Sequence, residues 1–370
     1  MPNLLHIITN FEGRGGAEIM MARLVNAFLG VDHRIIALRA CSDDLKSMIT
    51  RKDVSVEALG IGSLPSLLTK TRELAQQIAI HQPDVILSWM YHAAVVSTIA
   101  ARMARYRGRN YWNIRHSLQD TSIESFNTKF AMAACKLLSG KPDGIVFVSA
   151  RAEKEHLALG WTPRASRVIH NGLVSTDVSS VRARKPLIYG TAARFNPAKD
   201  YGTLLKAVEI VAAANPDITF VLAGRGVSRD NDEFMRLVKP LAIPEKNLKL
   251  CGEISDMRAF YEEIDVFVLP SRTEGFGNVL IEAMAHGRPC ISTDTGDASD
   301  IVGDSGRIVP TQNPSAMANA ILAMALQEPN TYAELATRAQ EIVRERFKIQ
   351  TIAAAYCDFM RIGASSEIST

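Results

Sequence analysis

The chain has 370 residues, of which 47% are hydrophobic and 22% charged, a balance typical of globular proteins. This length exceeds what one hydrophobic core usually serves, so two domains are expected. Residues 1–185 hold 24 Lys and Arg against 15 Asp and Glu, whereas residues 186–370 hold 18 against 24. This asymmetry favours contact of the first half with an anionic surface. The basic residues do not alternate with aromatic ones, which argues against nucleic-acid binding.

Hydropathy and cysteine spacing exclude several other classes. No stretch approaches the roughly 18 apolar residues of a membrane helix, and the short apolar run Leu4–Ile8 lacks the basic start of a signal peptide. The five cysteines lie far apart and show no metal-ligand spacing, so we expect reduced thiols, without disulfides or a zinc site. The sequence predicts a cytoplasmic protein, either soluble or peripheral on the inner face of the membrane.

Short β-rich runs alternate with amphipathic stretches through the first half of the chain. The expected strands are Leu4–Ile8, His33–Ala40, Val54–Ala58, Asp84–Ser88, Asn110–Arg115 and Gly144–Ser149. Helices are expected between them, for example over Ala17–Leu29 and Leu67–His81. Several strands are nearly continuous apolar runs, which is typical of strands covered on both faces. The pattern predicts an α/β domain with a doubly wound parallel sheet.

The alternation stops at a polar, basic linker, residues 178–186, and then starts again. The second set of expected strands is Leu187–Ala192, Ile218–Ala223, Leu248–Cys251, Val266–Leu269 and Pro289–Ser292. We predict two Rossmann-like domains, residues 1–180 and 186–345, that face a central cleft with ligands at the carboxyl ends of the strands. The remaining segment, residues 346–370, contains an expected helix, Ile349–Ile362, that could pack back on the first domain.

Two glycines, Gly15 and Gly16, follow the first strand and open the first helix. Glycines let backbone N–H groups approach a phosphate, and a helix N-terminus favours an anion. Glu18 stands where a dinucleotide fingerprint needs its third glycine, and no Walker lysine follows. A tight strand-to-helix turn is the alternative interpretation.

A pair of cations follows the first strand of the second half. Arg194 offers a planar fork of donors and Lys199 a movable point charge, so the two could converge on a diphosphate. Both residue types are common on surfaces, and a solvated pair is the alternative.

Two glutamates, Glu274 and Glu282, flank a turn that enters a helix near Gly277. Gly275 and Gly277 free the backbone for close approach, and the helix start directs N–H groups at an anion. A carboxylate before the turn can accept hydrogen bonds from sugar hydroxyls. A second carboxylate, about two helical turns further on, can hold a ribose diol.

The run Glu274-x7-Glu282, with Gly-Phe-Gly-Asn between, resembles the motif of family 4 glycosyltransferases, which have the two-domain GT-B fold. The resemblance covers most of the chain and is densest over residues 187–310. It also includes Asn171-Gly172, Arg194…Lys199, Val221–Gly224, Ile291–Asp294, Gly306…Pro310 and Gly15–Glu18. Arg225 and Asp297 depart from the family, which often has Asp and Gly at these positions.

The resemblance implies a nucleotide-diphosphate sugar as donor and a role for each matching residue. Arg194 and Lys199 would neutralise the diphosphate, while Gly15 and Gly16 would approach it from the other domain. Glu282 would bind the ribose. The turn and the helix start would hold the rest of the donor through Gly275, Phe276, Gly277, Asn278 and Val279.

Two residues are candidates for catalysis, His116 and Glu274. The segment Ile114–Ser117 resembles the family segment whose histidine contacts the transferred sugar, and Glu274 would grip that sugar. The resemblance also implies retention of anomeric configuration and no need for a metal cofactor. A structural role for His116 and covalent attack by Glu274 both stay open. The DxD-like run 230–232 is interpreted as a helix cap.

We therefore predict an enzyme that transfers a hexose-type sugar, with a UDP-sugar favoured, to a glycan or lipid-linked acceptor in lipopolysaccharide, other surface polysaccharide or glycolipid synthesis. Four arginines near the end of one helix suggest docking on anionic lipid, although a solvated helix end is the alternative: Arg102, Arg105, Arg107 and Arg109. A sugar-nucleotide epimerase and a non-catalytic nucleotide-sugar-binding scaffold remain alternatives. A dehydrogenase is weaker, because the first glycine loop lacks its third glycine.

Overall fold

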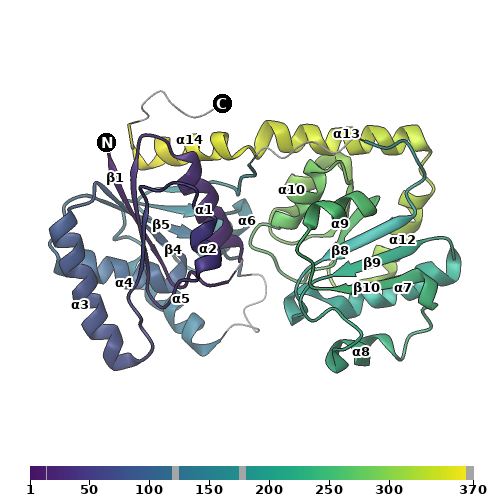
Figure 1. The fold of residues 1–370 in the computed structure, drawn as a ribbon, viewed down its shortest axis with the longest axis horizontal. Helices are drawn as coiled ribbons and strands as arrows, with labels where there is room; N and C mark the ends of the chain where they lie inside the picture. Colours follow the sequence, from purple (N-terminus) through teal and green to yellow (C-terminus); the bar gives the residue numbers. More distant parts are fainter. Residues whose placement is uncertain (14, 119–124, 175–180, 364–370) are drawn as a thin grey trace. The chain divides into compact units, whose positions relative to one another are not determined.

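The computed structural model describes residues 1–13, 15–118, 125–174 and 181–363, which fold as two compact units. The first unit consists of Met1–Val174 and Lys348–Thr370, and the second of Ser175–Phe347. Each unit is built on one parallel sheet with helices between its successive strands (Figure 1). The prediction of two Rossmann-like α/β domains is confirmed.

The sheet of the first unit has seven parallel strands in the order β3-β2-β1-β4-β5-β6-β7. They are β1 (Asn3–Ile8), β2 (Asp32–Ala37), β3 (Ser55–Ala58), β4 (Val85–Trp89), β5 (Arg109–Ile114), β6 (Gly144–Phe147) and β7 (Ser166–Val168). The three-residue edge strand β7 was not predicted, because so short a run gives no pattern. The strand order reverses between β1 and β4, and folds of this type bind ligands at the carboxyl edge of such a point.

Helices cover both faces of this sheet. They are α1 (Gly16–Ala27), α2 (Asp43–Ser47), α3 (Leu64–His81), α4 (Met90–Met103), α5 (Phe126–Leu138), α6 (Ala150–Ala158) and α14 (Ile349–Met360). Leu4, Val85 and Leu87 belong to the cluster that contains α1 and α14, whereas Leu5 and Ile86 belong to the cluster of α3 and α4. Adjacent strand residues therefore face opposite helix layers, which explains why these strands are apolar throughout.

The second unit has a six-stranded parallel sheet in the order β10-β9-β8-β11-β12-β13. Its strands are β8 (Ile188–Ala192), β9 (Thr219–Ala223), β10 (Leu248–Gly252), β11 (Val266–Leu269), β12 (Cys290–Thr293) and β13 (Arg307–Val309). Its helices are η2 (Pro197–Lys199), α7 (Tyr201–Ala214), α8 (Asp232–Val238), η3 (Glu245–Asn247), α9 (Met257–Glu263), α10 (Asn278–Ala285), α11 (Ala298–Val302), η4 (Gly303–Ser305), α12 (Pro314–Ala325) and α13 (Pro329–Arg346). Strand β13 was not predicted. The order reverses here between β8 and β11.

The last helix, α14, belongs to the first unit although the chain reaches it from the second. Its Ile352 and Tyr356 lie in the hydrophobic cluster of α1. The hydroxyl of Tyr356 accepts hydrogen bonds from Asn113 Nδ2 and Arg115 Nη1, both at 2.9 Å. Desolvation lowers the pKa of Arg115, the neighbour of His116 in sequence. The hydroxyl of Tyr356 accepts one of the hydrogen bonds that this enclosed guanidinium must make.

We expect Tyr356→Phe to lower the free energy of unfolding of the first unit by about 1–3 kcal/mol, because Asn113 and Arg115 would lose their shared acceptor. All three tryptophans of the chain lie in the first unit: Trp89, Trp112 and Trp161. Tryptophan fluorescence during urea unfolding therefore reports on this unit alone.

Tyr111→Phe is the matched control for this measurement. Tyr111 is buried in β5, but its hydroxyl has no hydrogen-bond partner among the described residues, so its loss should change the urea midpoint little. Equal midpoints for wild type and Tyr356→Phe would contradict the role given to α14.

Candidate active site

The turn between β11 and α10 carries the strongest sequence motif, and glycine geometry shapes it. Gly277 precedes α10 with φ of +92°, a conformation that favours glycine. Helix α10 has no side-chain cap, and Asn278 and Val279 form its first turn. Its first N–H groups are therefore directed toward the turn that contains Gly275, as an anion site requires.

Phe276 anchors this turn through its side chain. It is buried and makes an edge-on contact with Phe347, with 5.7 Å between ring centroids. Only the backbone of Phe276 can therefore face a ligand. Gly296 packs against the same turn, because a Cβ on it would lie 2.8 Å from the carbonyl oxygen of Glu274.

Glu274 and Lys199 form an ion pair that joins two predicted parts of the site. Lys199 Nζ lies 2.5 Å from Glu274 Oε1, and the two side chains are only 22% and 12% exposed. Ser271 Oγ donates to the same carboxylate oxygen at 2.6 Å. The N–H of Arg272 donates to the carbonyl of Ala198 at 2.8 Å. The loop after β8 and the turn after β11 therefore contact each other through side chains and backbone.

Arg194 lies at the exit of β8 and is exposed. Its guanidinium has no hydrogen bond or ion pair with any residue of the described part of the chain. The backbone beneath it is fixed by Gly224, whose φ is +138° and whose added Cβ would lie 1.9 Å from the carbonyl oxygen of Ala193. Arg194 thus combines a fixed backbone with a guanidinium whose donors can turn toward a ligand.

Glu282 lies in α10, about one helical turn after Asn278, and is half-buried. Tyr261 Oη, from α9, donates to Glu282 Oε2 at 3.4 Å. The ring of Tyr261 stacks on His286, with 5.1 Å between centroids. Tyr261 therefore helps to orient this carboxylate, a role that the sequence did not reveal.

The glycine loop of the first unit is placed at the start of α1, as predicted. Gly15, which has no side chain, is the N-cap of α1, and Gly16 is the first residue of the helix. A Cβ on Gly15 would lie 2.4 Å from Glu18 Oε2. The carboxylate of Glu18 thus lies beside the helix start that was predicted to approach the diphosphate.

A pocket of about 280 Å³ opens beside His116, at the carboxyl ends of β1 and β4. Its lining consists of Ile8, Thr9, Asn10, Glu18, Met90, Tyr91, His92, His116 and Thr128. The pocket lies where the strand order reverses, the position at which folds of this type bind ligands. Met90 has φ of +70°, a left-handed conformation that costs a non-glycine residue about 1–3 kcal/mol and occurs often at functional sites.

A chain of hydrogen bonds runs from His156 through Tyr91 to His116. His156 Nδ1 lies 2.6 Å from the carbonyl oxygen of Ala152, and a carbonyl only accepts, so His156 is protonated at Nδ1. Burial lowers the pKa of His156 to about 4. Its unprotonated Nε2 therefore accepts a hydrogen bond from the hydroxyl of Tyr91 at 2.8 Å.

Tyr91 then has no second proton to give, so its oxygen accepts from His116 Nδ1 at 3.3 Å. The form of neutral His116 that donates from Nδ1 to Tyr91 has its lone pair on Nε2. No sequence motif marks Tyr91 or His156. The one available signal was that Tyr91 follows closely on the end of a predicted strand.

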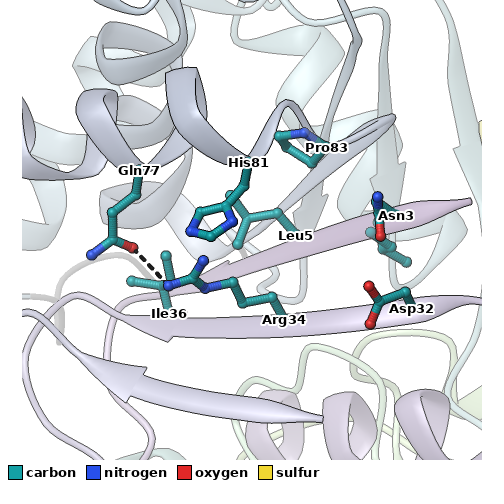
Figure 2. Close-up of a pocket in the computed structure, with 9 residues that line it drawn as sticks. Asn3, Leu5, Asp32, Arg34, Ile36, Gln77, His81 and Pro83 are labelled. Carbon is teal, nitrogen blue, oxygen red and sulfur yellow. Dashed lines mark hydrogen bonds between the residues drawn. The ribbon is translucent and has the colours of Figure 1, made fainter. Parts of the chain in front are cut away.

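A second pocket, of about 140 Å³, lies at the opposite edge of the same sheet. Figure 2 shows Arg34 beside the ring of His81, with a hydrogen bond to Gln77 that measures 3.5 Å. Arg34 also pairs with Glu57 at 2.8 Å. Because this pocket lies near the amino ends of β1 and β2, and folds of this type bind ligands at the carboxyl ends of the strands, we leave it out of the candidate active site.

The run 230–232 lies at the start of α8. Asn231 is the N-cap and accepts hydrogen bonds from the N–H groups of Glu233 and Phe234, which confirms the helix-cap interpretation. Within the described ranges, there is no group of three or more His, Cys, Asp or Glu that could hold a metal ion.

Two parallel-sheet domains with these loops define the class of GT-B glycosyltransferases. Residues 14–176 match the family model described as Glycosyltransferase Family 4, and residues 186–327 match the model described as Glycosyl transferases group 1. The chain is therefore a glycosyltransferase, and it belongs to the family 4 glycosyltransferases.

Individual proteins agree with this assignment. The chain is 25% identical over 364 residues to the lipopolysaccharide core biosynthesis glycosyltransferase LpsE of Rhizobium meliloti (strain 1021), covering 95% of this chain and 97% of that protein. It is also 25% identical to the capsular polysaccharide biosynthesis glycosyltransferase CapH of Staphylococcus aureus, covering 81% and 84%. The crystal structure of Anabaena HepE in complex with UDP and glucose has a TM-score of 0.81 at 20% identity, covering 97% and 99%. Sucrose-phosphate synthase of Thermosynechococcus elongatus has a TM-score of 0.82 at 19% identity, covering 98% of both chains.

We expect Tyr91→Phe to shift neutral His116 from the Nδ1–H tautomer toward the Nε2–H tautomer, because Nδ1–H loses its acceptor. The 15N chemical shifts of the ring nitrogens in long-range 1H–15N correlation spectra measure this change. His81, at the distant amino edge of the sheet, provides an internal control and should keep its shifts. A His116 that stays protonated at Nδ1 in the variant would show that Tyr91 does not set the tautomer.

Proposed function

We propose that this glycosyltransferase moves a hexose-type sugar from a nucleotide-diphosphate donor, with a UDP-sugar favoured, to a glycan or lipid-linked acceptor. The observation that carries the proposal is the contact between Lys199 and Glu274, which joins the cationic loop to the glycine turn. The complex of Anabaena HepE with UDP and glucose supports the choice of donor. The names of LpsE and CapH support a place in lipopolysaccharide or other surface polysaccharide synthesis.

The reaction requires stabilisation of a leaving diphosphate. The bond from the anomeric carbon to the β-phosphate oxygen breaks, the acceptor hydroxyl forms a new bond to that carbon, and the hydroxyl proton passes to an oxygen of the leaving diphosphate. Negative charge grows on the diphosphate, and preorganised cations and N–H groups are usually the largest catalytic contribution. In the proposal, Arg194, Lys199 and the start of α10 supply them, with Gly15 and Gly16 as further backbone donors. No metal is needed as cofactor.

The sugar and the ribose are assigned to hydroxyl-binding groups. Glu282, oriented by Tyr261, would bind the ribose diol. Glu274 and the backbone from Gly275 to Gly277 would hold the transferred sugar, with Asn278 and Val279 near the phosphate. His116 would accept a hydrogen bond from a sugar hydroxyl through Nε2. Retention of configuration, proposed from the family resemblance, requires the acceptor to attack from the face that the diphosphate leaves.

We expect Arg194→Ala and Glu282→Ala each to lower kcat/KM about 10²- to 10³-fold, because each removes a donor-binding group. Release of nucleotide diphosphate from a panel of UDP-sugars, with acceptor glycans, measures the effect. Arg258→Ala and Glu262→Ala are matched controls, because these residues form an exposed i,i+4 pair at 2.9 Å and should change activity less than about twofold. Full turnover in both folded site variants would contradict the assignment.

Product analysis separates the remaining alternatives. An epimerase would convert the donor without an acceptor. A nucleotide-sugar-binding scaffold would bind the donor and leave it intact with every acceptor. A thermal-shift screen of nucleotide diphosphates tests the donor class first, since a ligand selective for the folded state raises the melting temperature.

We further propose that the first unit contacts an anionic membrane from the cytoplasmic side. Of the described helices, none is long and apolar enough to span a membrane. Arg102, Arg105 and Arg107 are exposed at the end of α4, which supports contact with anionic lipid. Arg109 does not belong to this group, because its guanidinium donates to the carbonyl oxygens of Met360 and Arg361, both at 2.7 Å.

A further inference from the structure

Helix α5 carries its large apolar side chains on the outside. Phe126, Phe130 and Leu137 are 81%, 70% and 83% exposed. The fully buried residues of α5 are the smaller Ala131 and Cys135, whereas Met132 and Leu138 are half-buried. Cys135 Sγ donates to the carbonyl of Tyr91 at 3.3 Å. A helix of a globular protein normally buries most of its large apolar residues, whereas α5 exposes both of its phenylalanines and one of its two leucines.

The exposed residues form one stripe with lysines beside it. Phe126, Phe130 and Leu137 follow one another at intervals of four and seven residues, which places them on one face of the helix. Lys129 and Lys136 are exposed on the same helix, and the sequence has no Asp or Glu from residue 125 to residue 142. Aromatic and aliphatic residues with only basic charges beside them are typical of helices that lie in a membrane interface.

We propose that α5 is the membrane-docking element and lies on a bilayer of anionic lipids. Phe126, Phe130 and Leu137 insert between headgroups, while Lys129 and Lys136 pair with lipid phosphates. The excess of basic residues in the first half of the chain complements this charge. One face of a 13-residue helix is small against the roughly 1,000 Å² that a stable protein interface buries, which favours a bilayer over a second copy.

The position of α5 relates the bilayer to the pocket of His116. Thr128, in the first turn of α5, lines that pocket. Residues two apart on a helix point about 200° apart, so Phe126 and Phe130 face away from the pocket. The pocket therefore lies about one helix diameter, roughly 10 Å, from the docked surface. This inference rests on the proposed function in one respect, because a lipid-linked acceptor gives the docking its purpose.

Flotation of the full chain with vesicles, without donor or acceptor, tests the proposal. We expect wild type to float with phosphatidylcholine vesicles that contain phosphatidylglycerol and to remain unbound with phosphatidylcholine alone. In Phe126→Gln/Phe130→Gln, vesicle affinity should fall about tenfold or more, because two inserted rings are lost. Lys129→Gln/Lys136→Gln should lower affinity about tenfold or more at low salt, and less at high salt.

Leu68→Gln/Ile80→Gln is the matched control, since these residues are 70% and 76% exposed on α3. This variant should float like wild type. Absence of wild-type flotation, or an equal loss in both apolar double variants, overturns the proposal. A wild-type dimer that becomes monomeric in Phe126→Gln/Phe130→Gln also overturns it, because the stripe would then be a self-association interface.

The thermal shift produced by UDP, measured on the same proteins, keeps this proposal separate from the proposed function. A variant that loses flotation and keeps the UDP shift isolates docking from donor binding. If UDP gives no shift even with wild type, the proposed donor is wrong and the flotation result stands by itself.

Discussion

The ion pair between Lys199 and Glu274 depends on which strands are neighbours in the second sheet. Strands β8 and β11 pair directly through Tyr189 and Val266, although many residues separate them in sequence. All strands of the sheet are parallel, so the loops that follow β8 and β11 leave at the same edge. Lys199 can therefore reach Glu274 at 2.5 Å, and the N–H of Arg272 can bond to the carbonyl of Ala198. The proposed diphosphate site exists because two neighbouring strands end together.

The first unit has the same reversal of strand order as the second, but different side chains lie at the carboxyl ends of its strands. Its strand order also reverses between the first and fourth strands, β1 and β4. Asn10 follows β1, Tyr91 lies in the first turn of α4 directly after β4, and His116 follows β5; all three line the pocket. Here the lining has hydroxyl, imidazole and carboxylate groups, whereas the corresponding edge of the second unit has a cation pair and a glycine turn. The groups proposed to bind hydroxyls in the first unit and those proposed to bind phosphate in the second therefore follow the carboxyl ends of corresponding strands in their own sheets.

Most strands and helices, and the glycine and charged residues of the candidate site, could be predicted from the sequence. Strands buried on both faces give continuous apolar runs, so only the short edge strands β7 and β13 were missed. The turn with Gly275 and Gly277 and the charged residues Lys199 and Glu274 were predictable because their residue types alone indicate loops that can bind a ligand. The partners of these groups were not predictable in the same way. Tyr91, His156 and Tyr261 act through hydroxyl or ring contacts that depend on packing between elements distant in sequence, and Phe276 looks like a ligand contact until its burial is known.

Lys199 and Arg194 differ in their surroundings, and this difference suggests different roles in binding the donor. Lys199 is held by Glu274, and Ser271 donates to the same carboxylate, so its amine is already oriented before a donor arrives. Arg194 is exposed and without a described partner, so its side chain must become ordered when it binds. Preorganised groups lose less conformational freedom on binding and so stabilise developing charge more effectively. Under the proposed function, Lys199 would stabilise the charge that grows on the leaving phosphate, and Arg194 would capture a diphosphate that is charged from the start. Because residues 186–370 are net acidic, these two local cations have to offset an unfavourable long-range field.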